Sequence, residues 1–352
     1  MSLPSQQQAL FLATKEGKWI VSSIALHKPC VGEILVRVEA AALNPVDWKI
    51  RDFGMSDTDH HVILGCDCAG VVVELGEGVT NVAVGDSVLH QAEFDIRRGA
   101  FQQYAIASAD LVAKIPPNLT FDQAATIPVA MAAAAVGLYG RKVTMGGAAL
   151  LPPWRKDGFG KYAGEPIVIV GGATSVGQCV IQLAKISGFS PIITTASPHN
   201  TDFLKSLGAT HIIDRSADIP ATLKTITTSP ITLILDVIAQ PETQNWTYSV
   251  LAKGGTLIVF ETITLEKTVV GKVARTPWAF LHDGPNRELG VELMESLTSY
   301  LATDAIKPNA VEVLPNGLAS IPIGLERIRS GQVSAKKLVV HPQETPTPPP
   351  SP

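Results

Sequence analysis

Apolar and polar residues alternate over short stretches in the first part of the chain, and glycine and proline separate these stretches. Runs such as EILVRVEAA (33–41), DSVLHQA (86–92) and FQQYAIA (101–107) have the two-residue period of half-buried strands. Several short strands with turn residues between them are typical of an antiparallel, barrel-like domain. We therefore expect a β-rich domain over residues 1–127.

From Pro128 the pattern changes to apolar strands that alternate with helices. A proline suits the first turn of the Ala-rich helix that begins there. The expected strands are 166–172, 191–196, 211–214, 231–238 and 254–260, with helices over 175–188 and 199–208. Such alternation predicts an α/β domain with a doubly wound parallel sheet over residues 128–299. A last helix and strand follow in 325–340, and the Pro-rich residues 343–352 are expected to be a disordered tail.

Composition narrows the class of protein. Among 352 residues, 46% are hydrophobic, 17% are charged and the net charge is −4, without any Lys/Arg run. These values give no electrostatic reason to expect nucleic acid or an anionic membrane as partner. No apolar run reaches the roughly 18 residues of a membrane span. The cysteines are too few and too irregular for a disulfide framework, which favours the reducing cytoplasm: Cys30, Cys66, Cys68 and Cys179.

A glycine turn marks a candidate dinucleotide site. An apolar strand runs into Gly171 and Gly172, and a helix opens directly afterwards. The N–H groups and dipole at a helix N-terminus favour a pyrophosphate, although a plain helix-capping turn is the alternative. The fingerprint is loose, because threonine stands where the second glycine is expected. The predicted contacts are Gly172, Thr174, Ser175, Val176 and Gly177.

The end of the second parallel strand distinguishes NADPH from NADH. An NADH site usually has an acidic residue about 20 positions after the glycines, to bind the ribose hydroxyls. Here that place holds Thr195, Ala196 and Ser197. Ser197 opens a helix, so it either receives a 2′-phosphate or merely caps that helix. We predict NADPH as the cofactor, with supporting donors at His199, Asn200, Lys205 and Arg215.

These motifs, in this order, resemble the medium-chain dehydrogenase/reductase superfamily. The resemblance is carried by AALNPVDWK (41–49), GCDCAGVVVELGEGVTNVAVGDSV (65–88), residues 100–130, GGATSVGQCVIQLAK (171–185) and SGQVSAKKLVV (330–340). Residues 151–177 and 195–209 further resemble its fungal zinc-independent branch, which includes enoyl reductases of the lovastatin type that act in trans on polyketide synthases. Quinone oxidoreductases share this fold.

The resemblance implies an architecture. A GroES-like β-barrel catalytic domain would comprise residues 1–127 and 300–342, with a Rossmann domain of residues 128–299 inserted and the active site in the cleft between them. A polyketide synthase becomes a candidate partner, and monomer and homodimer both stay open.

The resemblance also shows which positions would hold zinc ligands if this chain had a zinc site. Zinc alcohol dehydrogenases of the superfamily place ligands near Asn44, in a Gly-His-Glu motif and in the following helix. Here those places read Asn44, Gly65-Cys66-Asp67 and the Ala-rich 131–136. Zinc needs three protein ligands, and only Cys66 qualifies. No metal is therefore expected, and the role of Cys66 and Cys68 stays open.

Without a metal, the chemistry that demands least is reduction of an activated C=C bond. Hydride adds to the β-carbon of an enone or enoyl thioester, and a proton reaches the α-carbon. The resemblance assigns a lysine in this motif to the substrate, so Lys49 is the first catalytic candidate and Asn44 the second. The alternative for Lys49 is solvent or a pair with Asp52. Asp47 is expected to brace the turn.

The substrate pocket has weaker candidates, namely Trp48, Phe53 and Thr262, and the two aromatic residues are equally compatible with plain core. The leading hypothesis is an NADPH-dependent reductase of small α,β-unsaturated carbonyl compounds. A quinone oxidoreductase is the alternative enzyme, and a crystallin-like NADPH-binding protein with little catalysis is the alternative of another class.

Overall fold

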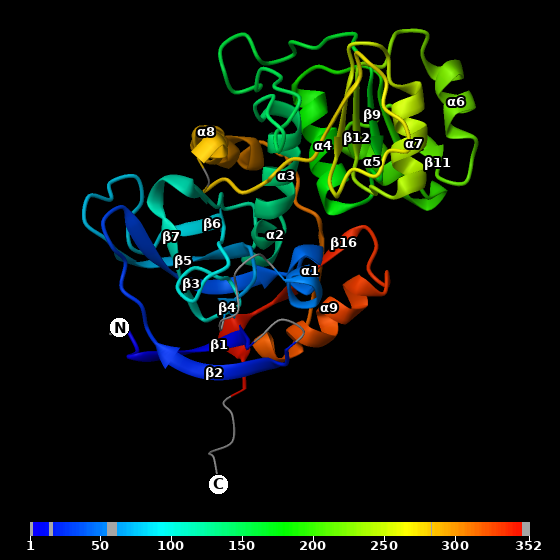
Figure 1. The fold of residues 1–352 in the computed structure, drawn as a ribbon. Helices are drawn as coiled ribbons and strands as arrows, with labels where there is room; N and C mark the ends of the chain where they lie inside the picture. Colours follow the sequence, from blue (N-terminus) through cyan, green and yellow to red (C-terminus); the bar gives the residue numbers. More distant parts are fainter. Residues whose placement is uncertain (1–2, 14–16, 55–61, 283, 347–352) are drawn as a thin grey trace. The chain divides into compact units, whose positions relative to one another are not determined.

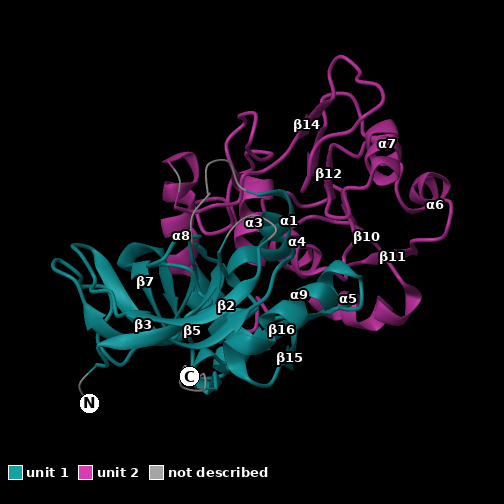
Figure 2. Ribbon diagram, turned by 60° about the horizontal axis from the view of Figure 1, so that its bottom comes forward, with its two compact units in different colours: residues 1–129, 297–302, 308–352 teal, residues 130–296, 303–307 magenta. Residues whose placement is uncertain are grey.

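The structure is a computed structural model that describes residues 3–13, 17–54, 62–282 and 284–346. It divides into two compact units (Figure 2). Unit 1 comprises residues 1–129, 297–302 and 308–352, and unit 2 comprises residues 130–296 and 303–307. The domain boundaries expected from the sequence stay a prediction.

Unit 1 contains two β-sheets. One has the order β2-β1-β4, and the other has the order β15-β16-β3-β5-β6-β8 with β7 paired to β3. The pairs are antiparallel except β15 with β16. The strands are β1 (Gln6–Leu12), β2 (Trp19–Ala25), β3 (Glu33–Ala42), β4 (Val62–Ile63), β5 (Asp67–Leu75), β6 (Ser87–Gln91), β7 (Tyr104–Ser108), β8 (Val112–Lys114), β15 (Ala310–Val313) and β16 (Lys336–Val340).

The β3–β5 pair positions the candidate catalytic residues. Ile34, Val36 and Val38 alternate into the core of unit 1, as the sequence pattern predicts. At the far end of β3, Ala42 pairs with Asp67, the first residue of β5. The chain then turns through Asn44 into α1 (Pro45–Phe53), which brings Asn44 beside the start of β5.

Short helices complete unit 1. They are η1 (Ala109–Leu111), α2 (Phe121–Ala125), η3 (Gly317–Ser320), α9 (Ile321–Arg329) and η4 (Pro342–Glu344). The last of these, η4, overlaps the first two residues of the expected tail, 343 and 344. The Gln343 amide nitrogen donates to the carbonyl oxygens of Gln103 (2.7 Å) and Val38 (3.1 Å), which orders this segment. The rest of the predicted tail, 347–352, lies outside the described residues.

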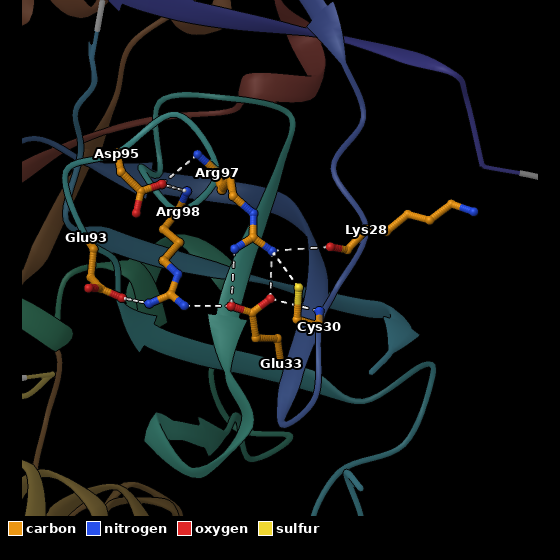
Figure 3. A network of polar contacts seen from close by, with 7 residues as sticks. All are labelled: Lys28, Cys30, Glu33, Glu93, Asp95, Arg97 and Arg98. Carbon is orange, nitrogen blue, oxygen red and sulfur yellow. Dashed lines mark hydrogen bonds and ion pairs between the residues drawn. The ribbon is translucent and has the colours of Figure 1, made fainter. Parts of the chain in front are cut away.

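An ionic network fixes the loop after β6 to the start of β3 (Figure 3). The Glu33 carboxylate receives Arg97 at 2.7 Å and Arg98 at 2.6 Å, and Arg98 also pairs with Glu93. The Cys30 backbone N–H donates to the same carboxylate at 2.8 Å. These hydrogen bonds hold the pKa of Glu33 at about 2, although burial opposes the shift.

Unit 2 is built on a six-stranded parallel sheet of order β11-β10-β9-β12-β13-β14. Its strands are β9 (Ile167–Val170), β10 (Ile192–Ala196), β11 (His211–Asp214), β12 (Leu233–Asp236), β13 (Thr256–Val259) and β14 (Val273–Arg275). The first five lie where the hydrophobic pattern predicts them, and the doubly wound fold is confirmed. The strand order reverses between β9 and β12.

Helices cover both faces of this sheet (Figure 1). Because crossovers are right-handed, α4 and α5 lie on one face and α6 and α7 on the other. They are α4 (Ser175–Ile186), α5 (Thr201–Leu207), α6 (Ile219–Ile226) and α7 (Pro241–Val250), with η2 (Pro198–Asn200) before α5. In such sheets the ligand crevice lies at the carboxyl ends of the strands, at the point of reversal.

Two further helices, α3 (Pro128–Tyr139) and α8 (Gly284–Ala302), have residues in both units. The expectation that no apolar run is long enough to span a membrane is wrong for the 19-residue segment Phe121–Tyr139, which is long and apolar enough to cross one, although 78% of its most apolar window is buried inside the fold. Such burial is typical of the core helix of a soluble protein.

Candidate functional site

The glycine turn after β9 has the geometry of an anion-binding loop. Gly171 adopts φ +89°, which a residue with a side chain rarely does. A Cβ on Gly172 would lie 2.1 Å from the Thr194 hydroxyl oxygen, and one on Gly177 would lie 2.2 Å from the Gly171 carbonyl oxygen. The backbone can therefore pass close to β10 and α4 only with glycine at these positions. The turn delivers the N-terminus of α4 to the crevice.

Thr174 acts as the N-cap of α4. Its hydroxyl oxygen accepts the Gly177 N–H at 3.0 Å and donates to the Gly171 carbonyl at 2.7 Å. This explains why threonine replaces the second glycine, because the side chain organises the turn itself. Ser175 and Val176 are half-buried in the first turn of α4, where helix geometry leaves N–H groups without an intrahelical carbonyl.

Ser197 and Arg215 are brought side by side. Ala196 and Asp214 are partners at the ends of β10 and β11, so the next residue of each strand lies at the same edge. The Arg215 N–H donates to the Ala196 carbonyl at 3.3 Å, and the Arg215 side chain is exposed. The Ser197 side chain makes no cap hydrogen bond to η2, so the plain capping role does not occupy its hydroxyl.

The other predicted donors to the 2′-phosphate divide into two groups. Asn200 and His199 lie in η2, where the Asn200 amide nitrogen is 3.2 Å from the His199 Nε2 atom. Lys205 lies in the last turn of α5. That turn is the end of α5 farther from η2. Lys205 stays a predicted donor.

Asp47 braces the turn into α1, as expected. Its carboxylate accepts the backbone N–H of Asn44 at 2.8 Å and that of Gly65 at 3.2 Å. Complete burial raises the pKa of Asp47 to about 7, and the two backbone hydrogen bonds oppose the shift. This residue thus ties α1 to the segment before β5.

Asp67 is the centre of a buried polar cluster that we define as Asn44, Cys66, Asp67 and Lys337. The Asp67 carboxylate pairs with the Lys337 ammonium and accepts the Asn44 amide N–H at 2.8 Å and the Val129 backbone N–H at 2.7 Å. The side chains of Asp67 and Lys337 are 0% and 3% exposed. Sequence reasoning missed Lys337, whose partner is 270 positions away.

The cluster does not fit a zinc site. Zinc needs three protein ligands, and Cys66 is the one thiol that this cluster offers. Both Asp67 oxygens already accept hydrogen bonds, and the Asn44 amide nitrogen faces Asp67 and the Cys66 sulfur, 3.7 Å away. Among the described residues, no group of three His, Cys, Asp or Glu side chains has the geometry for a metal ion.

Lys49 is half-buried on α1, with its ammonium nitrogen 5.7 Å from the centroid of the Trp48 ring. The Arg329 guanidinium carbon lies 5.9 Å from the same ring. Asp52, the alternative partner of Lys49, pairs with Arg51 at 2.7 Å and with Arg329 at 3.3 Å.

The predicted pocket residues are Trp48, Phe53 and Thr262. Trp48 packs against the core of unit 1 and contacts Phe53 edge to face, with 6.2 Å between ring centroids, whereas Phe53 itself is 70% exposed. Thr262 is exposed in unit 2, in the loop after β13, and its carbonyl accepts the Gln244 amide N–H at 3.0 Å. Sequence reasoning did not identify Gln244.

A separate hollow of about 300 Å³ in unit 1 is lined partly by Glu39, Asp122, His341 and Glu344. His341 bridges Asp122 at 2.7 Å and Glu344 at 3.0 Å. The hollow contains none of the predicted site residues.

Two family models match the chain, one in each unit. The alcohol dehydrogenase GroES-like domain matches residues 31–117, and the zinc-binding dehydrogenase domain matches residues 175–275. Together with the glycine turn and the parallel sheet, they define the class of the protein as a medium-chain dehydrogenase/reductase. Its cofactor class is accordingly a nicotinamide dinucleotide, NAD(H) or NADP(H).

Full-length relatives narrow this class. The trans-enoyl reductase grgB of a Penicillium species is 32% identical, over 96% of this chain and 99% of the relative. The enoyl reductase component lovC of the lovastatin nonaketide synthase of Aspergillus terreus is 31% identical, over 96% of each chain. The chain therefore belongs to the enoyl reductases of the medium-chain dehydrogenase/reductase superfamily, which confirms the predicted family.

Solved structures agree on the fold. An alcohol dehydrogenase superfamily protein from Novosphingobium aromaticivorans has a TM-score of 0.79 at 24% identity, over 95% of this chain and 99% of that one. The quinone oxidoreductase from Coxiella burnetii has a TM-score of 0.73 at 25% identity, over 95% and 98% of the two chains.

Proposed function

We propose that the protein is a zinc-independent, NADPH-dependent reductase of the C=C bond of α,β-unsaturated carbonyl compounds, either enones or enoyl thioesters. The observation that carries this proposal is the full-length similarity to trans-enoyl reductases. The buried cluster around Asp67 supports the zinc-independent part, because its donors are already engaged with one another.

The proposed preference for NADPH rests on the ends of β10 and β11. Ser197 offers a hydroxyl that makes no cap hydrogen bond, and Arg215 stands beside it with an exposed guanidinium. A guanidinium fork suits a phosphate dianion. The residue at the end of β10 is Ala196, so β10 itself offers no carboxylate to bind the ribose hydroxyls. The neighbouring Asp214 on β11 accepts the backbone N–H and the hydroxyl of Ser216.

The residues of this chain have distinct roles in the proposed reaction. When bound, the cofactor supplies the hydride that adds to the β-carbon of the substrate. Lys49 donates a hydrogen bond to the carbonyl oxygen of the substrate, where negative charge develops. Asn44 is the second candidate donor, and its amide would have to leave Asp67, to which it donates at 2.8 Å, to take this role. One such donor typically contributes about 2.7–4 kcal/mol to the rate. Trp48, Phe53 and Thr262 are the proposed pocket residues.

The test is a substrate panel with purified protein and NADPH. We expect NADPH consumption with enones or enoyl thioesters, and a Lys49→Met variant should retain NADPH binding while its kcat falls roughly 100-fold. Consumption with quinones alone would establish the quinone oxidoreductase alternative, and binding without consumption would favour the crystallin-like alternative.

Three broader expectations, on partner, location and oligomeric state, accompany this proposal. The relative lovC is a component of a polyketide synthase system, so a polyketide synthase is the proposed macromolecular partner here. The cytoplasm is the proposed location, and both monomer and homodimer are compatible with the proposal. Co-purification with a synthase tests the proposed partner, and sedimentation analysis measures the oligomeric state.

A further inference from the structure

Gln244 is a buried side chain that ties together two loops at the carboxyl edge of the parallel sheet. It lies on α7 and is 0% exposed. Its amide nitrogen donates to the Ala239 carbonyl at 2.9 Å and the Thr262 carbonyl at 3.0 Å, and its amide oxygen accepts the Thr264 N–H at 2.7 Å. The first loop follows β12 and the second follows β13. Gln244 thus uses both of its N–H donors to join them.

The loop after β12 is held in a constrained conformation. Ala239 adopts φ +55°, which costs energy in a residue with a side chain. Asp236 at the end of β12 accepts the N–H groups of Ile238 at 3.1 Å and Ala239 at 2.8 Å, and the Thr243 hydroxyl at 2.6 Å. With Gln244 on the Ala239 carbonyl, both sides of the turn are fixed.

This turn reaches the phosphate loop. A Cβ placed on Gly171 would lie 2.8 Å from the Ile238 side chain, so Ile238 packs directly over the left-handed glycine. Ile238 is 40% exposed, so part of its side chain stays accessible beside the glycine turn. The Gln244 loops therefore border the glycine turn on the side away from β10 and β11.

A dinucleotide lies across such a crevice, with its pyrophosphate at the first helix and one nucleotide on each side of the reversal point. The proposed 2′-phosphate donors lie beyond β10, so the adenosine half occupies that side. The nicotinamide half then extends over the ends of β12 and β13. We propose that Gln244 is a positioning residue for the nicotinamide half of the cofactor, acting through the two loops it joins. This inference rests on the proposed function.

The experiment compares two ligands. The Gln244→Met variant keeps a similar side-chain volume and removes the three hydrogen bonds. Kd is measured by calorimetry for NADPH and for adenosine 2′,5′-bisphosphate, which lacks the nicotinamide half. We expect Kd for NADPH to rise about tenfold, a change typical of losing buried hydrogen bonds, while Kd for the bisphosphate changes less than twofold. A merely structural role would weaken both ligands together.

The matched control is Gln182→Met. Gln182 is also buried in unit 2, and its amide exchanges two hydrogen bonds with the backbone of Lys307. It should lower thermal stability and leave the ratio of the two Kd values unchanged. Should Gln244→Met fail to fold, Gln244→Glu keeps the shape and removes both N–H donors, and the same change in ratio is expected.

An unchanged ratio in the Gln244 variant would overturn the inference, as would an equal ratio change in Gln182→Met. Failure of the wild-type protein to bind NADPH would instead contradict the proposed function, so the two failures are distinguishable.

Discussion

Polar side chains inside the fold have different roles in the two units. In unit 1, the cluster around Asp67 is an ion pair closed on itself, with its oxygens engaged by Lys337, Asn44 and the backbone of Val129. In unit 2, Thr174 and Gln244 form hydrogen bonds with backbone N–H and carbonyl groups of turns. The ordered turn leaves the N-terminus of α4 directed at the crevice. A closed cluster stabilises the fold, whereas an open turn binds an anion. Polar side chains in this fold thus satisfy one another in the Asp67 cluster of unit 1, whereas in unit 2 they order a turn whose N–H groups can bind a ligand.

The largest expected effect comes from breaking the ion pair. Lys337→Met leaves the Asp67 carboxylate buried without its cation, which should cost about 3–5 kcal/mol of unfolding free energy. The double variant Asp67→Leu/Lys337→Met should be more stable than Lys337→Met alone, because no buried charge remains. Urea denaturation measures both. If Lys337→Met lowered the unfolding free energy by less than about 1 kcal/mol, the Asp67–Lys337 pair would behave as a solvent-exposed pair, which would contradict its burial.

A substitution in the glycine turn should change the affinity for NADPH more than the stability of the fold. Gly177→Ala places a Cβ 2.2 Å from the Gly171 carbonyl oxygen, so α4 must move. Overpacking of this kind costs about 1–3 kcal/mol, and displacement of the helix N-terminus should weaken NADPH binding by about tenfold or more. Fluorescence titration with NADPH measures the binding. Gly284→Ala, where an added Cβ meets no atom within 4 Å, is the control; equal effects in both variants would contradict the proposed close packing.

Removing the Arg215 side chain should weaken the preference for NADPH over NADH. Arg215→Ala removes the proposed phosphate fork, and we expect Kd for NADPH to rise about tenfold while Kd for NADH changes less than twofold. Lys205→Ala serves as the matched variant, because Lys205 lies in the last turn of α5 and should leave both constants unchanged. If Lys205→Ala instead produced the larger loss of NADPH affinity, the assignment of the 2′-phosphate site would be wrong.

The smallest effect concerns Glu33. Its folded-state pKa of about 2 lies below the ordinary value of 4.5. The network in Figure 3 therefore stabilises unit 1 fully above about pH 4.5, and this contribution is lost as the pH falls toward 2. Glu33→Gln should cost about 1 kcal/mol at neutral pH and flatten the acid limb of the stability curve. Parallel acid limbs in wild type and variant would exclude this role.

Local patterns predicted much of the fold. Strands β9 to β13, helices α4 and α5 and the glycine turn are all encoded by residues close in sequence, through hydrophobic period and turn chemistry, whereas α6 and α7 were not predicted. The site around Asp67 was only half predictable. Asn44 and Cys66 lie in recognisable motifs, but Lys337 reaches Asp67 only because β16 pairs with β3.

Non-local packing also limits what local patterns can predict in two other places. Lys205 is a plausible phosphate ligand by distance along the chain, but its place relative to the ends of β10 and β11 depends on how α5 packs, which the local pattern does not encode. The segment from Gln343 to Pro346 has a disordered composition, yet Gln343 finds backbone carbonyls of Val38 and Gln103 in the larger sheet. Gln244 escaped notice because a buried glutamine within a helix carries no local signal of the loops it joins.

The central claim is NADPH-dependent reduction of an activated double bond without a metal. It is tested most directly by following NADPH oxidation with an enoyl thioester, using protein exhaustively treated with a chelator. The account predicts undiminished turnover, with one NADPH consumed per double bond reduced and the saturated thioester as product. Loss of turnover on chelation, with recovery on addition of zinc, would contradict it.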